Sequence, residues 1–265
     1  MTRRELLAGV GKVSSGLVLG VAATDQAAGQ VHTADRAQAA TAPGALPPAS
    51  VRKLKVMVAG GHPGDPEAGC GGTVARYSDL GHEVVILYMN RGEGFCGTHP
   101  LDQCGAVRTA EAEKACAILH ARPAFVGQID GKGVVDEAHY EMFRALYDAE
   151  RPDVVIAQWP IDRHPDHRAL SSLVLDAWLE TKQKAAFYYY EVGEDTMAFS
   201  ASEYVDISAV EARKRSAFYA HTSQGPDRWY QLQEKITRFR GVESGYAQAE
   251  GFIRHPQGKG GNLLP

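Results

Sequence analysis

The sequence predicts an α/β fold with a doubly wound, mostly parallel sheet and helices on both faces. From residue 53 onward, short apolar runs rich in β-branched and aromatic residues alternate with segments of helical periodicity. The apolar runs are continuous, which is typical of strands that are buried on both faces of a parallel sheet. With 265 residues and 44% apolar residues, the chain is long enough for one large domain.

The predicted elements follow in order from these runs and from the residues that end them. Strands are expected at 54–59, 83–89, 124–128, 153–158, 186–192 and 203–207. Helices are expected at 68–80, 106–119, 138–150, 167–181, 209–221 and 227–239. Gly81 ends the first helix, and the Arg151-Pro152 pair ends the third. We therefore predict one domain over 51–256 and a flexible, glycine-rich tail over 257–265.

Residues 1–50 differ from the rest because they show no hydrophobic periodicity. Arg3 and Arg4 precede a weakly apolar run that Lys12 interrupts, which resembles a twin-arginine signal peptide followed by a disordered linker. The segment from Ala37 to Ala39 offers a cleavage site. We therefore expect an exported protein, periplasmic or secreted; the alternative is a disordered tail with two incidental arginines.

Charge and hydropathy limit the partners. The formal net charge is −4, so the chain lacks the basic surplus that binding to nucleic acid phosphates requires. No apolar stretch reaches the roughly 20 residues that a membrane-spanning helix needs, so no stable membrane insertion is expected. The sequence favours a small-molecule partner and does not indicate an oligomeric state.

The four cysteines show no C-x-x-C spacing, which argues against a structural zinc knuckle. Cys96 and Cys104 bracket a short loop and could form a disulfide in an oxidising compartment. The alternative is a pair of buried free thiols. Cys70 and Cys116 fall in predicted helices, where we expect them to pack as small hydrophobic residues.

Two stiff loops carry nearly all the unusual polar residues. Gly60-Gly61-His62-Pro63-Gly64-Asp65 follows the first predicted strand, and Asp162-Arg-His164-Pro-Asp166-His167 follows the fourth. The carboxyl ends of parallel strands lie at one edge of the sheet, where such folds bind ligands. We therefore expect the two loops to converge.

Two imidazoles and one carboxylate, from His62, Asp65 and His167, suit a catalytic Zn²⁺ that keeps its fourth position open. Such ligands also accept other divalent metals. A zinc site can activate water and polarise the carbonyl of an amide. His164 would then stabilise the oxyanion or protonate the leaving amine, and Asp166 would orient a histidine.

Two alternatives compete with the metal site. An isolated histidine near a strand end is commonly a hydrogen-bonded structural residue. The glycines at 69–72 suggest a phosphate-binding loop, but the chain has no G-x-G-x-x-G and no G-K-[ST] motif. We expect these glycines to allow close packing of a helix on the sheet.

The motifs GHPGDPEAGCGGT and HPDH resemble those of the LmbE/PIG-L family of zinc-dependent N-acetylglucosaminyl deacetylases, over about residues 53–254. The resemblance implies a Rossmann-like fold, metal ligation by His62, Asp65 and His167, and catalytic assistance by His164 with Asp166 behind it. It also implies that Arg108, in Arg108-Thr-Ala-Glu111, contacts substrate. The alternative for Arg108 is an ion pair with Glu111 on the helix surface.

One departure concerns the catalytic base. The family usually reads H-P-D-D, with the first Asp as general base, but this chain has Gly64 at that position. A positioned base contributes about 10²- to 10⁴-fold to the rate. Glu67 is the nearest candidate for a replacement, and Asp162 or Asp166 could reach in from the second loop. Alternatively, Glu67 only stabilises the positive end of a helix.

The leading hypothesis is therefore hydrolysis of an N-acetyl group on an amino-sugar substrate by zinc-activated water. The first alternative is a zinc-containing binding protein or weakened enzyme of the same fold, because the usual base is absent. The others are a metallohydrolase for another amide or an ester, and a nucleotide-binding protein without metal. We expect the loops 92–105 and 193–203 to shape the pocket, and His221 either to line it or to cap a helix.

Overall fold

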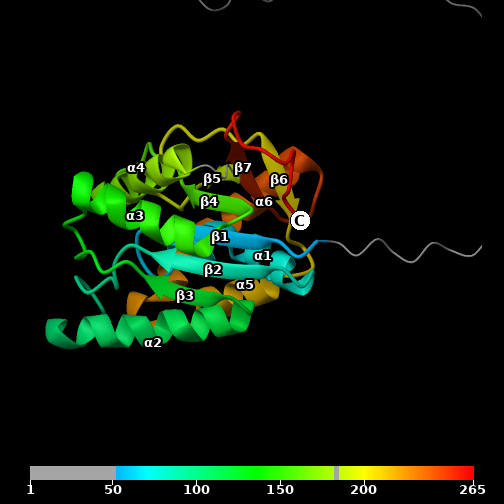
Figure 1. Cartoon of the computed structure of the whole chain (residues 1–265). Coiled ribbons are helices and arrows are strands. Elements are labelled where there is room, and N and C mark those ends of the chain that lie inside the picture. The colour runs from blue at the N-terminus through cyan, green and yellow to red at the C-terminus, as the bar shows by residue number, and fades with distance from the viewer. Residues whose placement is uncertain (1–51, 182–184) are drawn as a thin grey trace, which may run out of the picture. The chain divides into compact units, whose positions relative to one another are not determined.

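A seven-stranded sheet in the order β3-β2-β1-β4-β5-β7-β6 forms the centre of the computed structural model, which describes residues 52–181 and 185–265 (Figure 1). Five neighbouring strands are parallel, as predicted: β3 (Arg122–Phe125), β2 (Glu83–Tyr88), β1 (Lys55–Gly60), β4 (Val154–Gln158) and β5 (Ala186–Tyr190). Antiparallel pairing adds β7 (Ala249–Arg254) and then β6 (Glu203–Asp206). The sequence analysis missed β7, because Glu250 and Gly251 interrupt its apolar residues.

Helices cover both faces of the sheet, which confirms the predicted layers (Figure 1). The helices are α1 (Asp65–Asp79), α2 (Leu101–Leu119), α3 (Glu137–Glu150), α4 (Pro165–Glu180), α5 (Glu211–Phe218), the 3₁₀ helix η1 (Thr222–Gln224) and α6 (Pro226–Ser244). Alternate residues of β1 point to opposite faces. Val56 and Val58 pack with α1, α2 and α5, whereas Met57 and Ala59 pack with α3 and α4.

The helix boundaries differ from the predicted ones at both ends: α2 begins five residues earlier, α6 ends five residues later, and α5 is shorter at both ends. Helix α1 starts three residues before its expected position, and α4 starts two residues before its own. Each has a proline in its first turn. Proline fits there because the first helical N–H groups have no partner within the helix. Asp65 is consequently the first residue of α1 and lies in the positive end of that helix rather than in the preceding loop.

Close packing explains the glycines of α1. A Cβ atom at Gly72 would lie 2.6 Å from Cγ2 of Ile207, and one at Gly69 would lie 2.6 Å from the backbone oxygen of Glu191. Real Cβ atoms do not approach other atoms so closely, so α1 can rest against the sheet only without side chains at these positions. This confirms the packing role expected for the glycines.

The last residues of the chain contact the core, and the flexibility expected for 257–265 stays a prediction. Leu263 and Leu264 pack against the core, the N–H of Leu263 donates to Tyr188 Oη at 2.8 Å, and Tyr77 Oη donates to the Leu263 oxygen at 2.8 Å. The sequence analysis missed these contacts because a glycine-rich stretch precedes them. The twin-arginine signal and linker proposed for residues 1–50 lie outside the described residues. Within the described residues, no helix is both long and apolar enough to cross a membrane.

Candidate metal centre and pocket

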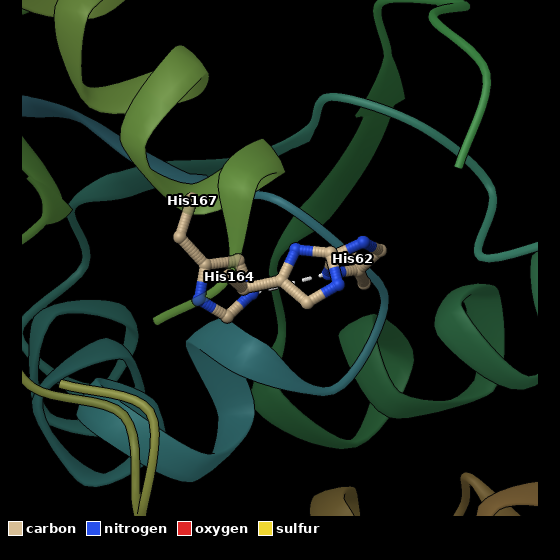
Figure 2. Close-up of side chains that lie close together, drawn as sticks. All are labelled: His62, His164 and His167. Carbon is tan, nitrogen blue, oxygen red and sulfur yellow. Dashed lines mark hydrogen bonds between the residues drawn. The ribbon is translucent and has the colours of Figure 1, made fainter. Parts of the chain in front are cut away.

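The two histidine-containing loops meet at one point of the sheet edge. The strand order reverses between β1 and β4, and ligands of doubly wound sheets bind at such a switch point. His62 follows β1, whereas His164 caps the amino end of α4 and His167 lies in its first turn. Their three imidazole rings lie close together (Figure 2). The convergence predicted for the two loops is confirmed.

Three donor atoms from these loops form a nearly equilateral triangle. His62 Nδ1 lies 3.2 Å from Asp65 Oδ2 and 3.2 Å from His167 Nε2, and His167 Nε2 lies 3.1 Å from Asp65 Oδ2. Around a tetrahedral Zn²⁺ with bonds of about 2.0–2.1 Å, neighbouring ligand atoms are about 3.3 Å apart. The triangle therefore fits one face of such a tetrahedron, and all three of its residues line the pocket.

Carboxylates behind the two rings fix their tautomers. His62 Nε2 lies 3.1 Å from Asp130 Oδ1 and 3.2 Å from Asp166 Oδ2, and His167 Nδ1 lies 3.0 Å from Asp162 Oδ1. A proton on each of these nitrogens can donate to its carboxylate. His62 Nδ1 and His167 Nε2, the two corners of the triangle, are then left with lone pairs for a metal.

The centre has a surplus of negative charge. Burial by itself would lower the pKa of both imidazoles, but the carboxylates outweigh it: they raise the pKa of His62 well above its ordinary value and that of His167 to about 9. Burial would raise the pKa of the Asp65 carboxyl, but His167 and His62 hold it well below its usual range. The same charges would stabilise a divalent cation in place of these protons.

Asp166 is fully buried and organises the centre from behind. It accepts hydrogen bonds from Asn90 Nδ2 at 3.0 Å and from the N–H groups of Gly131 at 2.7 Å and Gly133 at 2.9 Å. Burial opposes ionisation, but His62 and these amides lower the pKa of Asp166 to about 2. The resemblance placed Asp166 behind His164, whereas the structure places its carboxylate behind His62.

Asp130 is a site residue that the sequence analysis missed. Its carboxylate accepts from the N–H of Gly94 at 3.0 Å besides pairing with His62. Like the two histidine-containing loops, the segment that carries Asp130 follows the carboxyl end of a parallel strand, here β3. That position was the one signal in the sequence that could have identified it.

His164 forms part of the pocket wall beside the triangle. Its ring stacks on His167 with a centroid distance of 4.7 Å, and its Nδ1 accepts from the N–H of Asp166 at 3.2 Å. Burial, together with His62 and His167, lowers the pKa of His164, so the ring is neutral at pH 7. In the neutral form the proton must then be on Nε2, which makes this nitrogen a hydrogen-bond donor. One nitrogen of His164 also lies within 4.8 Å of a nitrogen of His62 and of His167, so His164 could belong to a ligand set. The set with Asp65 is more compact, because Asp65 Oδ2 lies only 3.1–3.2 Å from the other two donor atoms.

The proposed role of Glu67 as the replacement base is wrong. Its side chain is fully buried, does not line the pocket and is occupied by the N–H of Gly64 at 3.0 Å and the hydroxyl of Tyr88. His221 Nε2 lies 3.3 Å from the same carboxylate. Glu67 thus caps the start of α1, where Gly64 adopts φ = +108°. This is the alternative that the sequence left open.

Asp162 and Asp166 do not replace the base either. Asp162 is buried and accepts from His167, the N–H of His164 at 2.8 Å and the hydroxyl of Thr196 at 3.1 Å. Neither carboxylate lines the pocket. Both therefore support the histidines from the protein side.

Arg108 holds the loop that contains His62 in place. Its Nη2 donates to the Pro63 oxygen at 2.6 Å and its Nη1 to the Gly92 oxygen at 3.1 Å. The alternative of an ion pair with Glu111 is wrong, because Glu111 accepts from the hydroxyl of Thr222 and from Ser223 instead. Arg108 also lines the pocket, so its contact with substrate stays a prediction.

A cavity of about 310 Å³ opens above the triangle. Its lining combines polar residues, among them the three residues of the triangle, with the apolar residues Val192, Phe218, Trp229 and Leu232. The loop after β5 and the segment from α5 to α6 contribute most of the remaining lining. His221 lines the cavity as well, which resolves the alternative between lining and capping.

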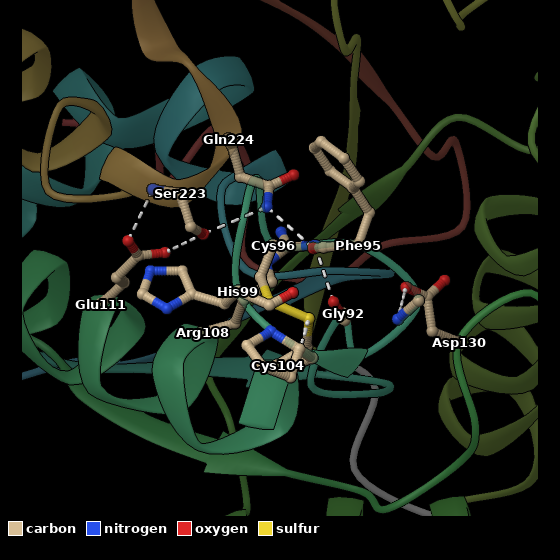
Figure 3. Close-up of a disulfide and its surroundings, with 12 residues drawn as sticks. Gly92, Phe95, Cys96, His99, Cys104, Arg108, Glu111, Asp130, Ser223 and Gln224 are labelled. Carbon is tan, nitrogen blue, oxygen red and sulfur yellow. Dashed lines mark hydrogen bonds between the residues drawn. A yellow bond between two sulfur atoms is a disulfide. The ribbon is translucent and has the colours of Figure 1, made fainter. Parts of the chain in front are cut away.

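Cys96 and Cys104 form a disulfide, whereas Cys70 and Cys116 are buried free thiols, as expected for helix-packing residues. The disulfide-closed loop packs against η1, where Gln224 Nε2 donates to the Phe95 oxygen at 3.0 Å (Figure 3). Gln224 also lines the cavity. The disulfide therefore stiffens one rim of the pocket.

We expect the double substitution Cys96→Ser and Cys104→Ser to lower the free energy of unfolding by about 2–3 kcal/mol. A cross-link removes conformational entropy from the unfolded chain, and the effect is modest for so short a loop. Urea denaturation of the two proteins measures the difference. A reductant should shift the wild-type curve and leave that of the double variant unchanged. Coincident curves for wild type and variant would contradict a stabilising disulfide.

Comparison with known proteins agrees with this geometry. Residues 57–178 match the family described as PIG-L, GlcNAc-PI de-N-acetylase. Diacetylchitobiose deacetylase of Thermococcus kodakarensis is 28% identical over 229 residues, which cover 75% of this chain and 82% of that protein. The crystal structure of the conserved protein TT1542 from Thermus thermophilus is 31% identical with a TM-score of 0.66, over 76% of this chain and 94% of that one.

The fold is also shared with N,N'-diacetylchitobiose deacetylase from Pyrococcus horikoshii, solved with its inhibitor MPG. That structure has a TM-score of 0.69 at 24% identity, over 77% of this chain and 85% of that one. The residues matched by the family model contain both histidine-containing loops and the switch point between β1 and β4. Together with these relatives, the two loop motifs show that the chain belongs to the PIG-L (LmbE-like) family.

Proposed function

We propose that this protein is a zinc-dependent N-deacetylase that removes the acetyl group from an N-acetylglucosamine-type substrate. The observation that carries the proposal is the triangle of His62 Nδ1, Asp65 Oδ2 and His167 Nε2, whose edges of 3.1–3.2 Å suit a tetrahedral zinc with one open position. When bound, zinc supplies Lewis acidity toward the amide carbonyl and makes water a better nucleophile. Another divalent metal could take the same ligands.

The residues around the triangle support hydrolysis of an amide. His164 lines the cavity with a neutral imidazole whose Nε2–H can donate to the developing oxyanion or to the leaving amine. Asp130, Asp162 and Asp166 hold the two ligand rings in their working tautomers. The chain therefore provides both orientation and a proton donor.

The cavity suits an amino sugar. Its volume of about 310 Å³ is at the lower end of ordinary small-molecule sites, which span about 300–1,000 Å³. Trp229 lines it, with its indole N–H fixed on the Gln224 oxygen at 3.2 Å and the Arg228 guanidinium 4.7 Å from the centre of its ring. A fixed aromatic ring of this kind can pack on the apolar face of a sugar. The two diacetylchitobiose deacetylases among the relatives favour the same substrate class.

Export through a twin-arginine signal remains part of the proposal. The Cys96–Cys104 disulfide supports it, because disulfides persist in oxidising compartments such as the periplasm. Fractionation of cells that express the full chain, with and without Arg3→Lys and Arg4→Lys, tests the route. Export that is unaffected by the double substitution would contradict it.

An acetate-release assay tests the activity. Metal analysis of the purified protein should give one zinc per chain, and acetate should be released from N,N'-diacetylchitobiose or N-acetylglucosamine but not from matched esters. Release from esters alone would favour the alternative metallohydrolase. No release by the native protein, together with release by Gly64→Asp, would favour a binding protein or weakened enzyme that has lost its base.

A further inference from the structure

The structure leaves the proton acceptor of the reaction to be identified. Among the residues that the structure describes, four carboxylates line the cavity, those of Asp65, Asp130, Glu194 and Asp195. The three candidates from the sequence, Glu67, Asp162 and Asp166, are buried outside it. A replacement for the carboxylate absent at Gly64 must come from the four that reach the cavity.

Three of these four are unsuitable. Asp65 is a corner of the metal triangle, and Asp130 is occupied by His62 and by the N–H of Gly94. Glu194 is exposed to solvent, where a carboxylate remains a weak base. Asp195 is half-buried, and within the described part of the chain its carboxylate makes no hydrogen bond and no ion pair.

The position of Asp195 is fixed relative to the second metal-binding loop. Its carbonyl oxygen accepts from the N–H of Arg163 at 2.8 Å, and the N–H of Met197 donates to the Ile161 oxygen at 2.9 Å. The neighbouring Thr196 hydroxyl donates to Asp162, the residue that holds His167. The backbone at position 195 is thus tied to the segment that positions a metal ligand.

The surroundings of Asp195 make its carboxylate a better proton acceptor than an exposed one. Burial raises its pKa, and the attraction of His167 and His164 is opposed by the repulsion of Asp162 and Asp65. Asp195 lines the ligand cavity without a partner, and an unpaired carboxylate with a raised pKa at such a place is a candidate functional group.

We propose that Asp195 replaces the missing base and accepts the proton of the attacking water; this inference rests on the proposed deacetylation. The water oxygen forms a bond to the acetyl carbonyl carbon while one water proton moves to the Asp195 carboxylate. The carbon–nitrogen bond then breaks, and the proton passes to the departing amine nitrogen. The products are acetic acid, which ionises to acetate in water, and the free amine, and the Asp195 carboxylate is restored.

Asp195→Asn tests the proposal, with Asp148→Asn as the matched control, because Asp148 is an exposed carboxylate of α3 outside the cavity. Asp195→Asn should reduce kcat by about 10²- to 10⁴-fold, the usual contribution of a positioned base, whereas Asp148→Asn should stay within about 3-fold of wild type on the same scale. Zinc content and the dissociation constant for N,N'-diacetylchitobiose, measured by tryptophan fluorescence, should stay unchanged in both variants. The melting temperature of Asp195→Asn should not fall, because its carboxylate has no partner to lose.

The outcomes separate the two proposals. If wild type releases acetate and Asp195→Asn does so at a similar rate, the base lies elsewhere and the inference about Asp195 fails while deacetylation stands. A fall in zinc content or melting temperature in Asp195→Asn would assign Asp195 a structural role and also overturn the inference. No release of acetate by wild type from any N-acetylated sugar would overturn both.

Discussion

Replacing His167 with alanine is expected to remove the metal and abolish deacetylation. His167 Nε2 is one corner of the triangle, 3.1 Å from Asp65 Oδ2 and 3.2 Å from His62 Nδ1. Two remaining donors cannot form a closed site for a tetrahedral ion. Replacing a residue that merely supports a ligand weakens metal binding by about 10- to 100-fold, so the loss of the ligand itself should exceed about 100-fold. Competition with a chromophoric chelator measures the affinity, and acetate release measures the activity.

Two controls make the result specific. Asp162→Asn keeps His167 but weakens the acceptor of its Nδ1–H, so its metal affinity should fall by only about 10- to 100-fold. His139→Ala removes a histidine that pairs with Asp136 at the start of α3, and it should bind metal like wild type. Equal metal affinity in wild type and His167→Ala would remove His167 from the ligand set.

Much of the site follows from one rule about parallel sheets. The carboxyl ends of β1 and β4 lie at one edge of the sheet. The sequence alone therefore predicts that the two loops carrying His62, Asp65, His164 and His167 lie near each other. The structure brings these side chains together. Ligation of the metal by His62, Asp65 and His167 stays a prediction.

The sequence could not identify the carboxylates that complete the site. Asp130 and Asp195 follow β3 and β5, but their motifs do not differ from those of ordinary polar loops. Whether such a side chain enters the cavity depends on long-range contacts, such as the bond from Gly94 to Asp130 and that from Arg163 to Asp195. Glu67 was chosen as a replacement base because it is close in sequence to Gly64, and this choice was misleading. The side chain of a glutamate three positions after the N-cap residue commonly accepts a hydrogen bond from the N–H of that residue, as Glu67 does from Gly64.

The second large effect concerns stability and lies away from the pocket. Lys214 of α5 and Glu250 of β7 form an ion pair of 2.6 Å, and both side chains are 1% exposed. Glu250 also accepts from the N–H of Gly72 at 2.9 Å and from the N–H and hydroxyl of Thr73 at 2.7 and 2.6 Å. One carboxylate therefore joins β7, α1 and α5. Glu250→Gln should lower the free energy of unfolding by about 3–5 kcal/mol, because the buried ammonium group of Lys214 loses its counter-charge.

The size of this effect depends on the buried charge that remains and much less on the lost contact. Adding Lys214→Met to Glu250→Gln removes that charge and retains most of the apolar volume, so the double variant should be more stable than Glu250→Gln alone. Urea denaturation of wild type and of the single and double variants measures the coupling between the two residues. If the double variant were the least stable of the series, the hydrogen bonds from Gly72 and Thr73 would dominate. The ion pair between α5 and β7 would then add little to the free energy of unfolding.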